Sequence, residues 1–171
     1  MSIRSVEIKA HCPNRDAVMT YLNQHGTYRG HDHQVDTYFQ VPNGRLKLRN
    51  GTIEKSLIAY LRPNVANQKL SEVSLYRPED PEQLAKVLKQ ALPVKVVVDK
   101  WRHIFFIDNV KFHVDEVKDL GAFVEIEATD DQGLKSDEDL GIQCTYFQKQ
   151  LGIIPDQLCR DSYSDMLLDR L

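Results

Sequence analysis

Between residues 107 and 128 the sequence contains two successive runs in which apolar and charged residues alternate, VKFHVDEV and GAFVEIEA. Residues two apart lie on the same face of an extended strand, so each run predicts a β-strand with one apolar face and one charged face. The fold must therefore bury the apolar faces and leave the charged faces against either solvent or a charged ligand.

Similar patterns predict about eight strands along the chain. They are expected at residues 2–12, 36–40, 45–49, 53–62, 69–76, 94–107, 109–117 and 121–129. Apolar stripes at helical spacing predict helices that begin near Asn14, Asp80 and Ser136. A last helical segment is expected over residues 155–171, and mobile loops at residues 26–35 and 63–68.

The predicted strands are joined by short turns or by single helices, which is typical of an antiparallel sheet. We therefore expect an α+β fold, an antiparallel eight-stranded β-barrel with the helices packed outside. The 171 residues contain no repeat, low-complexity tract or linker. The whole chain, residues 1–171, is expected to form a single domain.

Several of the predicted strands carry their charges on one face. The shared faces hold Ser5, Glu7 and Lys9; Arg45, Lys47 and Arg49; Tyr60 and Arg62; Lys100 and Arg102; Lys111, His113 and Asp115; and Glu125 and Glu127. One interpretation is a solvated outer surface. However, each predicted helix has a single apolar stripe that needs an apolar sheet face to cover, which would turn the charged faces into the barrel.

A barrel of about eight strands has room for one small ligand. Cations crowded into its lumen would repel each other strongly unless an anion were bound, and a polyphosphate matches so many positive charges. The carboxylates on the same faces are Glu7, Asp115, Glu125 and Glu127. They are hard oxygen ligands suited to Mg²⁺ or Mn²⁺, which bridges protein and phosphate oxygens.

The bulk properties argue against several other classes of protein. The net charge is −3, whereas proteins that neutralise nucleic-acid phosphates are normally basic, so no nucleic-acid partner is expected. The three cysteines are widely spaced, which predicts reduced thiols in a cytoplasmic protein rather than a zinc site or a disulfide framework. No apolar run is long enough to span a bilayer, so no membrane partner is expected. Either a monomer or a homodimer is compatible with the pattern.

Several motifs occur in an order that resembles the CYTH superfamily, whose members include class IV adenylyl cyclases, thiamine triphosphatases and inorganic triphosphatases. The motifs are VEIK (6–9), GRLKLR (44–49), YLRP (60–63), DKWR (99–102), VKFHVDEVKDLGAFVEIE (110–127) and SYSDML (162–167). They extend over nearly the whole chain and look most similar to the class IV adenylyl cyclase-like branch. The resemblance implies an antiparallel eight-stranded triphosphate tunnel.

The resemblance also implies roles for individual residues. The family's triphosphate-contacting cations correspond in this chain to Lys9, Lys47, Arg49, Arg62, Lys100, Arg102 and Lys111. Arg45 is added to this set because it shares a strand face with Lys47 and Arg49. Among them, Lys9, Arg62 and Arg102 are expected to be catalytic. Metal-binding carboxylates are matched by Glu7, Glu125 and Glu127, with Asp115 as a further expected ligand. The chain departs from the family's Glu-x-Glu-x-Lys signature at Ser5, where a carboxylate that binds metal or orients water is replaced.

The resemblance implies an adenylyl cyclase-like enzyme that uses Mg²⁺ or Mn²⁺ to convert ATP to cyclic AMP and pyrophosphate. A thiamine triphosphatase or an inorganic tripolyphosphatase, which hydrolyses the terminal phosphate, is an alternative. These activities need the same cationic tunnel, and they differ in which phosphorus atom lies beside the nucleophile. A non-catalytic module that binds a polyphosphate or a nucleotide is a further alternative.

Overall fold

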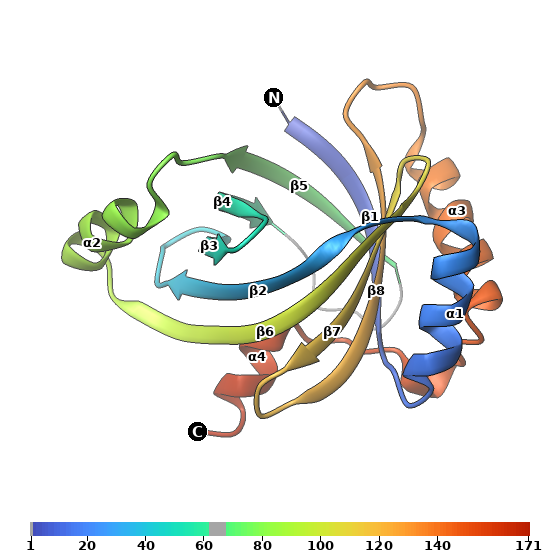
Figure 1. Cartoon of the computed structure of the whole chain (residues 1–171). Coiled ribbons are helices and arrows are strands. Elements are labelled where there is room, and N and C mark those ends of the chain that lie inside the picture. Colours follow the sequence, from blue (N-terminus) through green and yellow to red (C-terminus); the bar gives the residue numbers. More distant parts are fainter. Residues whose placement is uncertain (1, 62–67) are drawn as a thin grey trace.

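Within residues 2–61 and 68–171, which the structure describes, eight antiparallel strands form a closed barrel with four α-helices on its outside (Figure 1). The structure is a computed structural model. The strands are β1 (Ser2–His11), β2 (Thr27–Phe39), β3 (Arg45–Gly51), β4 (Lys55–Leu61), β5 (Lys69–Tyr76), β6 (Val94–Ile107), β7 (Val110–Val117) and β8 (Gly121–Asp130). The helices are α1 (Arg15–His25), α2 (Pro81–Ala91), α3 (Asp137–Gln150) and α4 (Tyr163–Leu168), with a 3₁₀ turn at Pro155–Gln157.

The barrel is closed by its first and last strands. Around the barrel the strand order is β1-β5-β4-β3-β2-β6-β7-β8, and β1 also pairs with β8. Glu7 and Glu127 are register partners across this closing pair. The expected α+β fold, an antiparallel barrel with helices outside, is confirmed.

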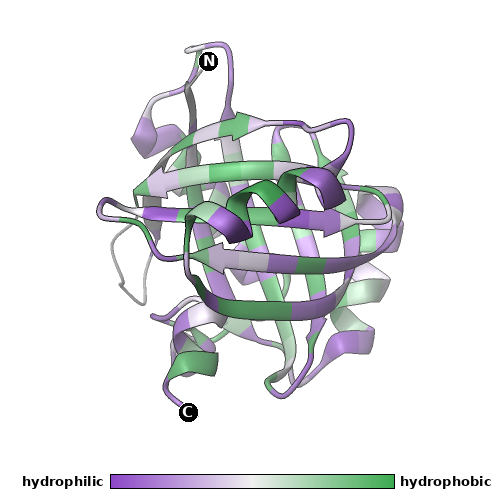
Figure 2. Ribbon diagram, turned by 90° about the vertical axis from the view of Figure 1, so that its left-hand side faces the viewer, coloured by the Kyte–Doolittle hydropathy of each residue, from purple (hydrophilic) through white to green (hydrophobic). Residues whose placement is uncertain are grey.

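The apolar faces of β1, β7 and β8 point outward and lie beneath α1 and α3. The largest buried cluster joins Val6, Ile8 and Ala10 of β1, Phe112 and Val114 of β7, and Val124 and Ile126 of β8 to Val18 and Leu22 of α1 and Leu140, Cys144 and Phe147 of α3. Full burial of each valine, leucine, isoleucine or phenylalanine side chain in this cluster contributes about 1.5–3 kcal/mol to the stability of the fold. Figure 2 shows the resulting alternation of hydrophobic and hydrophilic residues along the strands. The charged faces of these three strands are thereby left to line the interior of the barrel.

The predicted helix starts are confirmed by their capping interactions. The side chains of Asn14 and Asp80 accept backbone N–H bonds of 3.3 and 2.9 Å, and Ser136 and Asp139 form a reciprocal capping box. These bonds satisfy donors that a helix leaves unpaired at its start. Among the described helices, none combines the length and the apolar character needed to cross a membrane.

The prediction of a mobile loop at residues 26–35 is wrong, because most of this segment belongs to β2. The strand pairs with β6 over most of its length. On the outer face, the rings of His31 and His33 lie 4.8 and 4.7 Å from the ring of Trp101 on β6. Cross-strand ring contacts of this kind stabilise a strand whose composition looks loop-like. In the second predicted loop, residues 63–67 lie outside the described residues.

The C-terminal segment, residues 155–171, is only partly helical. The 3₁₀ turn and α4 are joined by an extended stretch in which the backbone N–H of Cys159 donates a 2.8 Å hydrogen bond to the carbonyl of Lys9. Ser162 caps α4, and the next residue, Tyr163, is buried against the barrel. This segment therefore brings an aromatic side chain to the charged interior.

Candidate active site

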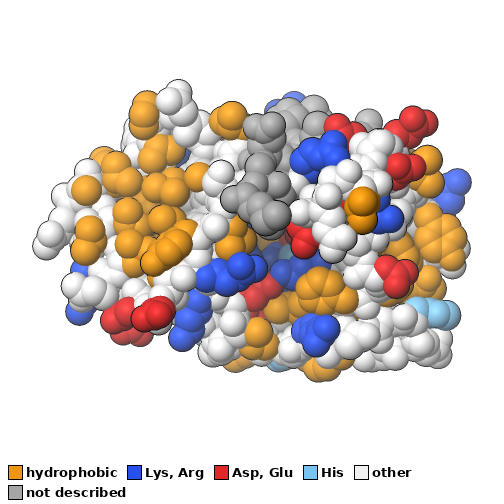
Figure 3. Space-filling view, turned by 90° about the horizontal axis from the view of Figure 1, so that it is seen from above, with side chains coloured by type: hydrophobic (Ala, Val, Ile, Leu, Met, Phe, Trp, Pro, Cys, Tyr) orange, Lys and Arg blue, Asp and Glu red, His pale blue; other side chains and the backbone are white. Residues whose placement is uncertain are grey.

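The barrel encloses a cavity of about 890 Å³, lined by inward-facing residues of every described strand. Small-molecule sites typically measure about 300–1,000 Å³. The charged residues and the histidine in its lining are Glu7, Lys9, Asp36, Lys47, Arg49, Glu54, Lys55, Arg77, Lys100, Arg102, Asp108, Lys111, His113, Glu125, Glu127 and Asp131. Seen from above, basic and acidic side chains gather near the centre of the molecule (Figure 3). The expected inward direction is confirmed for the residues of the charged faces that appear in this lining, which include neither Arg45 nor Asp115.

Asp36 on β2, for which the sequence pattern indicates no role, joins three cations of the lumen. Arg49 donates hydrogen bonds of 2.9 and 2.8 Å to its carboxylate, and Lys100 donates one of 2.8 Å. The Nζ atom of Lys47 lies 3.8 Å away. Burial alone would raise the pKa of Asp36, but the three cations hold it well below its usual range. Asp36 therefore stays charged and fixes the orientation of Arg49 and Lys100.

The lysines beside Asp36 are held in an environment that disfavours their charge. Burial lowers the pKa of Lys100 to about 7, and the attraction of Asp36 only partly opposes this. The nearby guanidinium groups of Arg49 and Arg102 lower it further. Burial and Arg49 also lower the pKa of Lys47. An anion in the lumen would restore the full positive charge of these lysines.

Arg102 on β6 is held by acidic partners on two neighbouring strands. It donates hydrogen bonds of 2.7 and 2.6 Å to Asp115 and one of 3.0 Å to Glu125. The hydroxyl of Tyr163 donates a 2.7 Å hydrogen bond to Asp115. Within the described part of the chain, Asp115 is not a lining residue of the cavity. The geometry thus makes Asp115 a support for Arg102, and its expected role as a metal ligand stays a prediction.

Glu125 connects Lys9 and His113 at the wall formed by β1, β7 and β8. The Nζ atom of Lys9 lies 3.4 Å from Oε1 of Glu125 and 4.0 Å from the centre of the Tyr163 ring. Nδ1 of His113 lies 3.0 Å from Oε2 of Glu125. Burial, reinforced by Arg102, lowers the pKa of His113 to about 4. A neutral imidazole therefore donates from Nδ1 to the carboxylate of Glu125.

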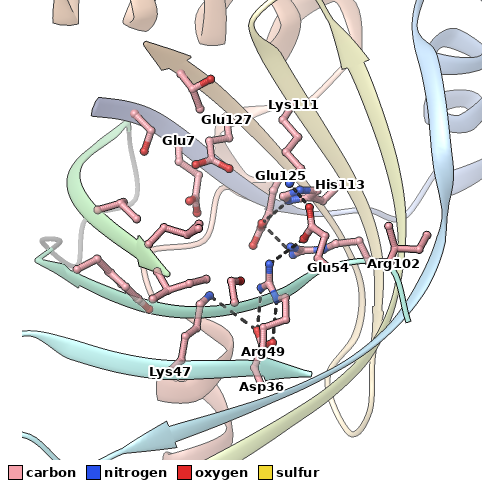
Figure 4. A pocket seen from close by; sticks show the side chains of 18 of the residues that line it. Glu7, Asp36, Lys47, Arg49, Glu54, Arg102, Lys111, His113, Glu125 and Glu127 are labelled. Carbon is pink, nitrogen blue, oxygen red and sulfur yellow. Dashed lines mark hydrogen bonds and ion pairs between the residues drawn. The ribbon is translucent and has the colours of Figure 1, made fainter. Parts of the chain in front are cut away.

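Glu54 lies in the turn between β3 and β4 and reaches across the lumen. Its carboxylate accepts hydrogen bonds of 3.0 Å from Arg49 and 3.0 Å from Gln34, and a further one from Lys111 on β7. Burial would raise the pKa of Glu54, but Arg49 and Lys111 lower it far below its usual range. Figure 4 shows this carboxylate among the basic side chains of the lumen.

Carboxylates interleaved with the cations overturn one expectation from the sequence. Cations crowded into the lumen were expected to repel each other unless an anion was bound. In the structure, Asp36, Glu54 and Asp115 each accept hydrogen bonds from lumen cations. The lumen is therefore charge-compensated by its own side chains, and an anionic ligand has to compete with them.

Glu7 and Glu127 are the predicted metal ligands that the structure places in the most suitable surroundings. They are register partners on β1 and β8, and both line the cavity (Figure 4). Burial raises the pKa of Glu127, and the charge of Glu7 raises it further. A divalent cation would relieve this repulsion, so the pair fits Mg²⁺ or Mn²⁺.

The geometry also indicates how such a metal would be held. In the part of the chain that the structure describes, no group of three or more His, Cys, Asp or Glu side chains could hold a metal ion by itself. Mg²⁺ commonly binds one or two carboxylates and completes its shell with substrate phosphates and water. Glu7 and Glu127 would supply the protein's share of such a shell.

Apart from Glu7 and Asp115, the site residues predicted from the sequence fall into three groups by their position in the structure. Lys9, Lys47, Arg49, Lys100, Arg102, Lys111, Glu125 and Glu127 line the cavity. Arg45 instead donates hydrogen bonds of 2.8 Å to Asp165 and 2.7 Å to Ser162 near α4. Arg62 lies outside the described residues. The roles of all these residues stay predictions.

One wall of the cavity is apolar. It is formed by Tyr38 of β2, Ile58 and Tyr60 of β4, Val73 and Leu75 of β5, and Pro78. Ile58 is the register partner of Leu75, and Tyr60 that of Val73. An apolar wall beside a cationic one suits a ligand that carries an organic group on a chain of phosphates.

Solved structures with the same architecture come from archaea, bacteria and a plant. The PH1012 protein of Pyrococcus horikoshii has a TM-score of 0.76 at 22% identity, over 94% of this chain and 98% of its own. A candidate adenylate cyclase of Vibrio parahaemolyticus has a TM-score of 0.75 at 17% identity, over 96% and 97% of the two chains. A candidate adenylyl cyclase of Hippeastrum, for which a dominant triphosphatase activity is described, has a TM-score of 0.65 at 13% identity, over 99% and 95%. At these identities the likeness shows a shared fold.

Family membership comes from the sequence itself. A search of curated protein sequences found no significant match. The family model for the CYTH domain, however, matches residues 4–163. This match takes in β1 from Arg4 onward, β2 through β8 and the first residue of α4, and so includes part or all of every strand that lines the cavity. The chain therefore belongs to the CYTH domain family.

Proposed function

We propose that this protein is a metal-dependent enzyme that binds a nucleoside triphosphate in the barrel lumen and acts on it as a class IV adenylyl cyclase does. The observation that carries the proposal is the combination of a cationic wall, an apolar wall and the inward pair Glu7 and Glu127 in one cavity. The family match and the candidate cyclases among the similar structures support it.

The lumen residues have complementary tasks in this proposal. Lys9, Lys47 and Lys111 bind phosphate oxygens, and Arg102, held by Asp115, presents a fixed guanidinium to them. The apolar wall takes the nucleoside. A divalent cation on Glu7 and Glu127 supplies charge neutralisation and polarises the phosphorus–oxygen bonds when it is bound.

In the cyclase reaction the 3′-hydroxyl oxygen of the ribose attacks the α-phosphorus. A new oxygen–phosphorus bond forms, the bond from the α-phosphorus to the bridging oxygen breaks, pyrophosphate leaves, and the hydroxyl proton is released to water. The lumen accelerates this step in two ways. The wall residues hold the two reacting atoms of one molecule together, and Lys9 and Arg102 stabilise the charge that develops on the phosphate oxygens.

Ser5 favours cyclisation over hydrolysis. Its side chain is buried and lines the cavity at the position where the family signature has a carboxylate. Hydrolysis needs a water molecule that is oriented and deprotonated, and a serine hydroxyl does this poorly. Cyclisation takes its nucleophile from the substrate, so the loss of this carboxylate affects it less.

A triphosphatase is the second candidate. It is favoured by the Hippeastrum protein, a candidate adenylyl cyclase with a dominant triphosphatase activity and the same fold. Thiamine triphosphate or tripolyphosphate would bind the same cations, displaced along the lumen so that the terminal phosphorus lies beside the metal.

The test is an analysis of products by ³¹P NMR. Purified protein is incubated separately with ATP, thiamine triphosphate and tripolyphosphate, in the presence of Mg²⁺ or Mn²⁺. Cyclic AMP with pyrophosphate supports the cyclase, whereas orthophosphate with a diphosphate supports the triphosphatase. The matched variants Glu127→Gln in the lumen and Glu116→Gln on the outer face separate lumen chemistry from contamination, because only the first should lose activity. Tight binding without any product would identify a binding module and contradict both activities.

A further inference from the structure

We propose that Glu54 competes with a bound triphosphate for the phosphate-binding cations Arg49 and Lys111. The triphosphate displaces the carboxylate of Glu54 when it binds, and the return of this carboxylate to the two cations assists product release. The inference rests on the proposed triphosphate-binding lumen. It concerns a residue for which the sequence pattern indicates no role.

Glu54 forms a bridge across the lumen. Its Oε2 atom lies 3.0 Å from a guanidinium nitrogen of Arg49 on β3, and its Oε1 atom accepts a hydrogen bond from Lys111 on β7. In the barrel order, β2 and β6 lie between these two strands. The carboxylate thus joins cations that belong to different walls, which is the same linkage that a phosphate group would make.

The backbone that carries Glu54 is held in place by Asp32, a fully buried residue. Asp32 accepts hydrogen bonds of 2.8 and 2.9 Å from the backbone N–H groups of Ile53 and Glu54, and one of 2.8 Å from the hydroxyl of Thr52. A Cβ atom on Gly51 would lie 2.5 Å from the carbonyl oxygen of Glu54, so only glycine allows this close turn. The position of the carboxylate is therefore built into the fold rather than taken up by chance.

Glu54 is better suited to displacement than the other carboxylate bound to Arg49. Asp36 is 1% exposed and also bonded to Lys100, so it has no route out. The side chain of Glu54 is 22% exposed and lines the cavity. When Glu54 rotates away, Arg49 keeps its two hydrogen bonds to Asp36, and only Lys111 needs a new anionic partner.

This arrangement has a defined energetic consequence. A phosphate that reaches Lys111 must break the hydrogen bonds of Glu54 to charged partners, and this cost lowers the affinity for substrate and product alike. The same carboxylate can return to its cations as the product leaves. Glu54 therefore weakens binding and hastens release, so its removal should strengthen binding. Removal of a residue with a merely structural role would weaken binding instead.

The test compares Glu54→Gln, which keeps the size of the side chain but removes its charge, with Glu116→Gln. Glu116 lies on β7 with a side chain that is 61% exposed, so this control removes the same charge outside the lumen. Dissociation constants of tripolyphosphate and pyrophosphate are measured by isothermal titration calorimetry in EDTA. Glu54→Gln should bind both about tenfold more tightly than the parent, and Glu116→Gln should bind both as the parent does. Glu54→Ala provides the same loss of charge if the glutamine variant does not fold.

The outcomes separate this inference from the proposed function. Unchanged or weaker binding by both Glu54 variants, with a parent protein that binds tripolyphosphate, overturns the inference and leaves the proposed function in place. If the parent and the variants all fail to bind tripolyphosphate both in EDTA and with Mg²⁺ present, the proposed function fails and the inference falls with it. Tighter binding together with stronger inhibition by pyrophosphate supports the role in product release.

Discussion

Arg102 on β6 and Asp115 on β7 are register partners joined by two hydrogen bonds of 2.7 and 2.6 Å, and both side chains are almost fully buried. Burial lowers the pKa of Arg102, but Asp115 and Glu125 outweigh it and raise that pKa well above its ordinary value. The pair is part of the framework that aims a guanidinium into the lumen. It gives Asp115 a role that needs no metal.

Replacing Asp115 by Asn should therefore destabilise the protein even when no metal is present. The change leaves the charge of Arg102 buried with one partner fewer, which typically costs about 3–5 kcal/mol. Urea unfolding in EDTA measures the loss. A variant that keeps the parent's free energy of unfolding in EDTA but no longer responds to Mn²⁺ would instead make Asp115 a metal ligand.

Replacing Glu127 should have the opposite effect to replacing Asp115: the stability of the metal-free protein should not fall, but metal binding should weaken. The pKa of Glu127 is raised by burial and by the charge of Glu7, so Glu127→Gln removes a repulsion and should not lower stability in EDTA. It should weaken the affinity for Mn²⁺, measured calorimetrically with tripolyphosphate present, by at least about tenfold. Glu116→Gln, with the same loss of charge on the outer face, is expected to bind Mn²⁺ as the parent does. Equal Mn²⁺ affinity of the parent and the Glu127 variant would remove Glu127 from the metal site.

The lowered pKa of Lys100 leads us to expect that the protein takes up a proton when it binds its ligand. The pKa of Lys100 in the folded protein is about 7, so the ammonium group is largely deprotonated at a pH well above that value. A bound polyphosphate raises this pKa, because it favours the charged form, and the lysine then takes up a proton. Calorimetry in two buffers with different ionisation enthalpies, somewhat above neutral pH, measures this uptake.

Lys100→Arg is the matched variant for this measurement. Arginine keeps its charge at every accessible pH, so this variant should take up fewer protons than the parent when it binds tripolyphosphate, with Lys47 as the remaining contributor. Binding enthalpies that are the same in both buffers for the parent would contradict the account, since they would mean that Lys100 is already charged.

The sequence is sufficient to predict the architecture because the strand pattern leaves few solutions. Once strands such as β7 and β8 each have one apolar face, helices with single apolar stripes can only cover that face from outside. The charged faces then line the interior. The alternation along each strand is therefore enough to predict that Lys47, Lys111 and Glu127 share one cavity.

The carboxylates that compensate the cations are harder to predict, for two different physical reasons. Asp36 shares a face with Tyr38 in the strand expected at residues 36–40, but Phe39 makes the other face apolar too, so alternation in this short run does not decide which face is inward. Glu54 falls inside the strand expected at residues 53–62, whereas the structure starts β4 at Lys55 and leaves Glu54 in the preceding turn, where alternation does not apply. Its inward direction depends on hydrogen bonds to Asp32, twenty-two residues earlier, and no local pattern reveals them.

The most direct test of the account is whether a triphosphate stabilises the protein through the lumen cations. Thermal and urea unfolding are measured with and without tripolyphosphate for the parent, for Lys47→Met, and for Lys95→Met, which alters an exposed lysine on β6. At a concentration of 100 times its dissociation constant, the ligand should add about 2.7 kcal/mol to the parent and to the Lys95 variant. Lys47→Met should lose most of this stabilisation, because it removes a cation of the lumen. Stabilisation of the Lys47 variant equal to that of the parent, or no stabilisation of the parent at any concentration, would contradict it.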